Sequence, residues 1–121
     1  MTSTSSNVAK LCLDLDRKVI EYSESVTARA HADATYKAER AKRILRARAE
    51  GAKSIAEAET TADADDVIRD LRLQHLITEG SADALQKAIA ALRVRIDYGR
   101  SVIATERAMD TLHSQGTGGH A

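Results

Sequence analysis

Residues 36–50 read YKAERAKRILRARAE and residues 53–70 read KSIAEAETTADADDVIRD, with only Gly51 and Ala52 between them. The first stretch carries six lysines or arginines against two glutamates, and the second carries six acidic residues against two basic ones. Opposite charges attract when they are brought side by side. The pattern therefore predicts a helix that turns back at the glycine onto a second helix of opposite charge.

The turn itself has clear local signals. Gly51 is a strong helix breaker, and the basic residues before it suit the negative end of a helix dipole. Ser54 can cap the following helix, with Glu57 three residues later completing a capping box. We expect an antiparallel helical hairpin over residues 7–113, with its turn near residues 50–54.

The charges also predict a register. In an antiparallel hairpin, the numbers of paired residues add to a constant, and 103 brings three opposite charges together. The expected ion pairs are Arg46 with Glu57, Arg40 with Asp63, and Lys37 with Asp66. Carried along the chain, this register leaves residues 97–113 without a partner in the first helix, where they are available to a second subunit or another molecule.

Apolar residues follow helical spacing on both sides of the turn. The first stripe changes from large residues to alanine halfway along: Val8, Leu11, Leu15, Val19, Tyr22, Val26, Ala30, Ala34, Ala38, Ala41, Leu45 and Ala49. The second keeps heptad spacing: Ala64, Ile68, Leu71, His75, Thr78, Ala82, Leu85, Ile89, Leu92, Ile96, Gly99 and Ile103. Because that spacing is unbroken, one continuous or slightly kinked helix is favoured across Gly80 and Ser81 over two helices.

Composition supports this all-α prediction. The 121 residues have no Pro, Phe or Trp, and 30% are charged, a profile typical of long helices and coiled coils. Further apolar residues outside the second stripe, such as Leu73 and Val94, widen its face beyond what one helix covers. We therefore expect a coiled-coil hairpin that assembles into a multi-helix bundle, as a dimer or higher homo-oligomer, with a flexible tail at 1–6 and a disordered one at 114–121.

The sequence offers no recognisable catalytic or metal-binding arrangement. Residues 61–66 are acidic but lack the spacing and central glycine of a calcium loop. His75 lies on the second stripe and is interpreted as a hydrogen-bonded core residue that fixes register. We predict a protein that is not an enzyme, with no cofactor, metal or small-molecule substrate. The zero net charge, the single Cys12 and the lack of a long apolar run predict a cytoplasmic protein that does not enter membranes.

The most distinctive segment is LRVRIDYGRS at residues 92–101. Gly99 within a strong helix costs about 1 kcal/mol relative to alanine, which is tolerated where another backbone or a ligand approaches closely. A contact between subunits is one explanation, and a partner-binding surface is the other. The candidate partner-binding residues are Arg93, Arg95, Tyr98, Gly99, Arg100, Ser101 and Arg107.

These motifs resemble a family. The shared pattern combines Tyr36-Lys37, a glycine turn with a following lysine, an EAE run at 57–59, the segment at 92–101 and a trailing Glu106-Arg107. It resembles small helical bacteriophage proteins, mostly uncharacterised, that are encoded among early genes near single-strand-annealing recombinases and single-strand-binding proteins. The resemblance implies an accessory role in the host cytoplasm.

Three functional hypotheses follow. The first is a phage accessory protein that binds a partner protein, in DNA recombination or replication. The second is direct single-stranded nucleic-acid binding through the C-terminal arginines, for which three tyrosines offer little base stacking. The basic run at residues 37–48 is a further candidate for phosphate contact, although the acidic run is placed to cancel it. The third is a structural or scaffolding component of a virion or other assembly.

Overall fold

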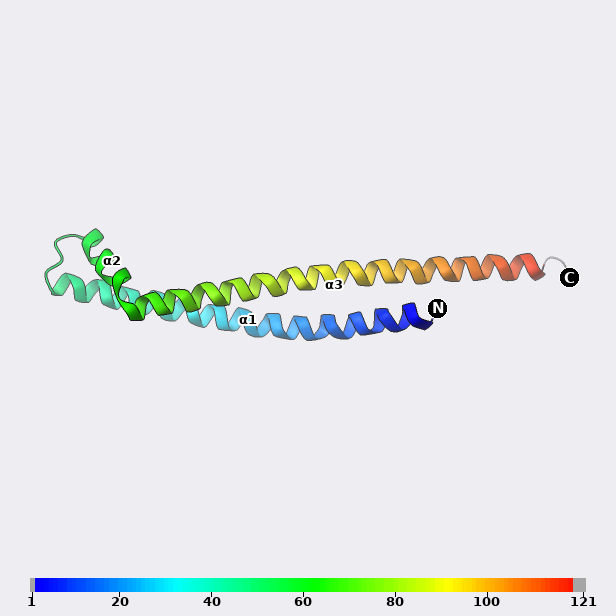
Figure 1. The fold of residues 1–121 in the computed structure, drawn as a ribbon, viewed down its shortest axis with the longest axis horizontal. Helices are drawn as coiled ribbons and strands as arrows, with labels where there is room; N and C mark the ends of the chain where they lie inside the picture. The colour runs from blue at the N-terminus through cyan, green and yellow to red at the C-terminus, as the bar shows by residue number, and fades with distance from the viewer. Residues whose placement is uncertain (1, 119–121) are drawn as a thin grey trace. The chain divides into compact units, whose positions relative to one another are not determined.

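The computed structural model describes residues 2–118, with side chains over residues 3–116. It contains three helices, α1 (Thr2–Ala49), α2 (Ile55–Ala64) and α3 (Asp66–Gly118), and no strand among the described residues (Figure 1). The predicted all-α class is confirmed. The chain divides into two compact units, each described by itself: unit 1 is Met1–Ile20 with Gln86–Ala121, and unit 2 is Glu21–Leu85.

The turn after α1 lies where the sequence predicts it. The Glu50 and Ala52 amides donate to the carbonyls of Arg46 and Ala47, at 2.9 and 3.0 Å. Gly51 adopts φ +114°, a conformation that disfavours any residue with a Cβ. The Ser54 hydroxyl accepts a hydrogen bond from the Glu57 amide at 3.1 Å, which caps α2.

The returning chain is broken at Asp65, where the sequence predicts an uninterrupted helix. Asp65 is extended, with φ −68° and ψ 132°. Its carboxylate accepts hydrogen bonds from the Val67 and Ile68 amides at 3.0 and 3.3 Å, so it serves as the N-cap of α3. One short helix, α2, therefore precedes the long one, and the prediction of a single helix from Ser54 is wrong.

This break changes the register between the helices of unit 2. The numbers of Arg40 and its partner Asp63 in α2 add to 103, as predicted. From the break onward, Arg43 pairs with Asp65, and Asp33 lies near His75. The residue numbers of each of these pairs add to 108. α1 is antiparallel to the returning helices of unit 2. The predicted register holds between α1 and α2, whereas the pairing between α1 and α3 is shifted from it by five residues.

The contact face of α1 in unit 2 also differs from the prediction. Beyond Val26 the predicted stripe, which continues to Ala49, is exposed, and its one large residue there, Leu45, is 70% exposed. All but one of the steps in this part of the stripe are four residues long, and each such step moves the position about 40° around the helix and away from the contact face. The residues of α1 that are buried or half-buried in unit 2 alternate steps of four and three, as in a heptad, and most of them are polar. They include Arg29, Asp33, Tyr36, Arg40, Arg43 and Ala47.

Unit 1 is held by larger aliphatic side chains, because Ile89, Leu92 and Ile96 of α3 are buried there. α3 runs without interruption through Gly80 and Ser81, as favoured from the sequence. Its predicted stripe is confirmed from residue 68 onward, since those positions are buried or half-buried, whereas Ala64 lies in α2 and is exposed.

The helices extend closer to the chain ends than predicted. Residues 2–6 belong to α1 and residues 114–118 to α3, so the predicted helix boundaries at residues 7 and 113 are wrong. No Pro, which would remove a helix hydrogen bond, precedes residue 7 or follows residue 113. The predicted flexibility of these tails stays a prediction, and residues 1 and 119–121 lie outside the described part.

Candidate functional site

Three of the seven predicted partner-binding residues, Arg95, Tyr98 and Gly99, line one groove in unit 1. This groove, here called the Tyr98 groove, has a volume of about 620 Å³ and is mainly apolar. Its lining comes from both helices: Thr4, Asn7, Val8 and Leu11 of α1, and Val94, Arg95, Tyr98, Gly99 and Val102 of α3. A Tyr98 side chain that is 73% exposed forms part of its rim.

Gly99 lets the two helices of unit 1 approach closely. A Cβ built on Gly99 would lie 2.5 Å from Cγ2 of Val8, which is closer than side-chain carbons tolerate. The sequence predicts close approach at this glycine, and the neighbour is the α1 helix of the same chain. The prediction that residues 97–113 have no partner in the first helix is therefore wrong at its start, because Gly99 still contacts α1.

The other predicted arginines lie on a different face of α3. Arg93, Arg100 and Arg107 are exposed and spaced seven residues apart, so they form a row, here called the arginine row. At 100° per residue, Arg93 and Tyr98 point about 140° apart. None of the three arginines has an ion pair among the side chains that the structure describes. Ser101 is exposed and belongs to neither the row nor the groove.

In unit 2, one of the three predicted ion pairs between helices is present. Arg40 donates from Nε and Nη2 to both carboxylate oxygens of Asp63, at 2.8 and 3.2 Å. This hydrogen bond lowers the pKa of Asp63 against the smaller opposing effect of burial, and it raises the pKa of Arg40. Arg43 forms a second ion pair, with Asp65.

The Asp65 carboxylate has several partners that together lower its pKa. Burial is the largest single influence and raises this pKa, but hydrogen bonds from the Ile68 and Val67 amides and the charge of Arg43 outweigh it. The carboxylate thus stays ionised at the α2–α3 break, where it caps the positive end of α3.

Two predicted ion pairs are absent from the described side chains. Lys37 pairs with Asp33 in its own helix, at 3.0 Å, and not with Asp66. Glu57 accepts from the Lys53 amide at 3.0 Å, and Arg46 has no ion pair in the described part of the chain. Both predictions are wrong. The break at Asp65 shifts the register beyond it, which moves Asp66 away from Lys37, and Glu57 accepts from the backbone of the turn before it can reach Arg46.

His75 lies in a small polar cluster that the sequence did not reveal. Its ring stacks on Tyr36, with centroids 6.0 Å apart and an interplanar angle of 11°. Nε2 lies 3.7 Å from Asp33 and 3.8 Å from Glu79. Nδ1 is buried without a hydrogen-bond partner, so the prediction of a hydrogen-bonded core histidine is wrong.

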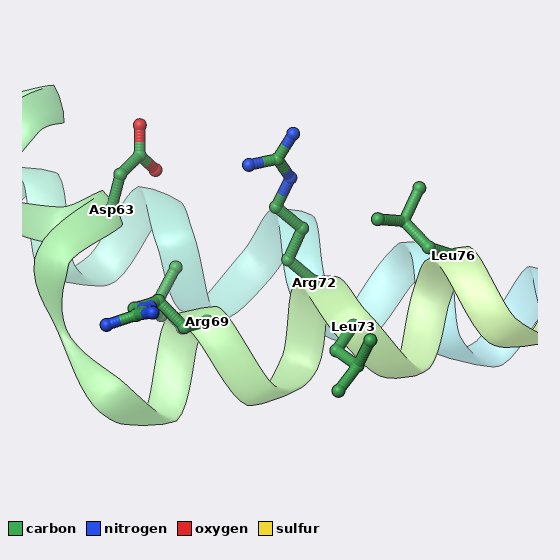
Figure 2. Close-up of a pocket in the computed structure, with 6 residues that line it drawn as sticks. Asp63, Arg69, Arg72, Leu73 and Leu76 are labelled. Atoms are coloured by element: carbon green, nitrogen blue, oxygen red, sulfur yellow. The ribbon is translucent and has the colours of Figure 1, made fainter.

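A second groove in unit 2 has a volume of about 350 Å³ (Figure 2). Its lining residues are Asp63, Ile68, Arg69, Arg72, Leu73 and Leu76. Figure 2 shows Arg72 and Leu76 projecting in the same direction from α3. The sequence identified Leu73 only as an apolar residue outside the second stripe.

The described residues provide few means for other chemistry. Residues 2–118 contain no group of three His, Cys, Asp or Glu side chains arranged to hold a metal ion. Within the same range, no helix has the length and apolarity needed to cross a membrane. Comparisons of the chain with protein-family models, curated proteins and solved structures found no match.

Proposed function

We propose that this protein is a non-enzymatic helical adaptor: an antiparallel coiled-coil hairpin that self-associates and binds an acidic partner protein through the arginine row. The observation that carries the proposal is the position of Arg93, Arg100 and Arg107. They are exposed, they share one face of α3, and none of them has an ion pair within 4 Å among the side chains that the structure describes.

The spacing of the row fits a protein partner. Successive arginines lie about 10.5 Å apart along α3, since each residue adds 1.5 Å. A partner helix with carboxylates at heptad positions presents its charges at the same interval. Planar guanidinium groups bind carboxylates in pairs of hydrogen bonds, which makes such contacts directional.

Single-stranded nucleic acid fits the same surface less well. Binding of that kind combines cations along a backbone with aromatic rings on which bases stack. Tyr98 is the one tyrosine in the α3 segment, and it points about 140–180° away from the three arginines of the row. A strand on the row would therefore gain phosphate contacts without stacking.

Self-association is supported by the small core. The buried apolar side chains of unit 2 are Ile68 and four alanines, and those of unit 1 are Ile89, Leu92 and Ile96. Alanine burial contributes little because the apolar area removed from water is small. Large apolar side chains stay exposed in both units, as expected if further copies cover them.

The biological process in which the adaptor acts is inferred from the family resemblance. It favours an accessory role in phage DNA recombination or replication in the host cytoplasm. A scaffolding role in a virion uses the same self-association, and mass spectrometry of purified particles distinguishes the two. Abundant protein in the particle would support the scaffold and contradict the adaptor.

Charge reversal tests the arginine row. A tagged Arg100→Glu/Arg107→Glu protein is expected to lose the acidic partner that the unmodified protein retains from infected cells. The control is Arg17→Glu/Arg48→Glu, which reverses two exposed arginines outside the row. Equal recovery by all three proteins, or no stable partner with any of them, contradicts the proposal.

An electrophoretic shift assay tests the nucleic-acid alternative. With 30-nucleotide single strands at low salt, we expect no shift by the unmodified protein. A shift that weakens with salt and disappears in the Arg100→Glu/Arg107→Glu protein would identify the row as a phosphate-binding surface and replace the protein-partner proposal.

A further inference from the structure

α3 carries a second apolar face in unit 1, here called the outer face, besides the one covered by α1. Its members follow helical spacing: Val94, Tyr98, Val102, Thr105, Met109 and Leu112. Val94, Met109 and Leu112 are 68%, 65% and 68% exposed. The outer face continues directly from the Tyr98 groove, because Val94, Tyr98 and Val102 belong to both.

The end of α3 projects beyond α1 within unit 1 (Figure 1). The Val8–Gly99 contact sets the register here, and α1 begins at Thr2, so positions beyond about residue 105 have no α1 residue opposite them. Side chains 107–116 are accordingly exposed. An isolated helical segment of this length is marginal in water, which favours a partner that covers its apolar side.

We infer that the partner is a second copy of this chain, whose α3 lies antiparallel along the outer face. In this arrangement Met109 of each copy enters the Tyr98 groove of the other copy. Residue numbers that add to about 203 then lie opposite each other, so Val94 faces Met109, Tyr98 faces Thr105, and Ala91 faces Leu112. Each large side chain meets a smaller or flexible one, the combination that fills space without overlap.

The charges at the groove favour this direction. Arg95 lines the groove on the α1 side of the outer face. In the antiparallel register its position falls between Glu106 and Asp110 of the other copy, each about one half-turn away.

The proposed contact between the two α3 helices leaves no second contact surface for a third copy. Because both copies use the same face in opposite directions, the arrangement has two-fold symmetry and ends as a dimer. Residues 91–112 extend over about 33 Å of helix at 1.5 Å per residue. The contact covers the apolar residues of the projecting end and of the Tyr98 groove together, while Arg93, Arg100 and Arg107 stay outside it and free for another partner.

This inference rests on the self-association proposed above, and the test separates the two. Sedimentation equilibrium of the full chain is expected to show a monomer–dimer equilibrium. Met109→Lys, which changes a side chain exposed in the monomer, should raise the dimer dissociation constant at least tenfold. Leu13→Lys changes an equally exposed leucine of unit 1 outside the contact and should leave the constant within threefold.

Cysteine pairing tests the register. In a Cys12→Ser background, a mixture of Val94→Cys and Met109→Cys proteins should form a mixed disulfide under mild oxidation, because the two positions are opposed. Either protein alone should cross-link at least fivefold more slowly. A charge exchange adds an independent readout: Arg95→Glu should weaken the dimer, and Glu106→Arg/Asp110→Arg in the same chain should restore it.

The contradicting outcomes are distinct. A monomer at all concentrations up to 200 µM overturns both this inference and the proposed self-association. A dimer or larger species that Met109→Lys leaves intact overturns the α3 contact alone. Faster cross-linking of Val94→Cys with itself than with Met109→Cys overturns the register. Failure of the arginine row to bind a partner affects none of these measurements.

Discussion

Unit 1 and unit 2 use the same two long helices but are stabilised differently. Unit 2 combines small buried alanines with charged pairs and a stacked Tyr36–His75 contact. Unit 1 buries isoleucine and leucine and brings its helices together at a glycine. Exposed ion pairs contribute at most about 1 kcal/mol each, whereas a buried aliphatic side chain contributes about 1.5–3 kcal/mol. The comparison therefore predicts that unit 1 responds to changes of volume and unit 2 to changes of charge.

The largest expected effect comes from removing a buried side chain in unit 1. Ile96 is 4% exposed, and Ile96→Ala should lower the free energy of unfolding by about 2–4 kcal/mol, because it leaves a cavity. Thermal unfolding followed by circular dichroism measures this. Val94→Ala, on the exposed side of the same helix, is the control at low protein concentration. A loss under 1 kcal/mol for Ile96→Ala would show that unit 1 is not held by its aliphatic core.

A smaller loss is expected from filling the close approach at Gly99. Gly99→Leu should cost about 1–3 kcal/mol, because its side chain collides with Val8. Val8→Ala in the same protein should recover part of that loss. The matched control is Gly80→Ala, whose Cβ meets no atom within 4 Å and which should stabilise the helix by about 0.5–1 kcal/mol. Equal effects at the two glycines would contradict the close contact.

The turn of unit 2 should be sensitive to its backbone. Gly51→Ala forces a residue with a Cβ into φ +114° and should cost about 1–2 kcal/mol. Chemical denaturation at fixed protein concentration measures this. Ala52→Gly, at the neighbouring position, should cost less than half as much. If Gly51→Ala were neutral, the turn would have to adopt a different conformation from the one described.

The smallest expected effect is a pH dependence confined to unit 2. The pKa values of Asp63 and Asp65 are lowered in the folded chain. Their contribution is therefore fully present above the unfolded value near 3.8 and is lost as pH falls through the lower folded pKa values. Stability should fall less between pH 4.5 and 2 in Asp63→Asn than in the unmodified protein. An identical acid profile in the two proteins would show that the Arg40–Asp63 pair does not stabilise the fold.

The sequence predicts a good deal of this architecture and much less of the contacts. Gly51, Ser54 and the Arg40–Asp63 pair could be identified because each depends on a few neighbouring residues or one strong charge pattern. The register beyond Asp65 could not, because that aspartate resembles the other acids of the run until its amide partners are known. The role predicted for the seven site residues stays a prediction, and their separation into a groove and an arginine row required the helix geometry.

The extended backbone at Asp65 has a consequence for how the chain tolerates change in length. A residue inserted or deleted between Gly51 and Asp65 disturbs α2 and its contacts with α1 but not the phase of α3, because α3 restarts from its own cap. The heptad phase of the 53-residue helix is then preserved whatever precedes it. Homologous chains should vary most in length within this short connector, and they should keep an aspartate, asparagine or serine where the long helix begins.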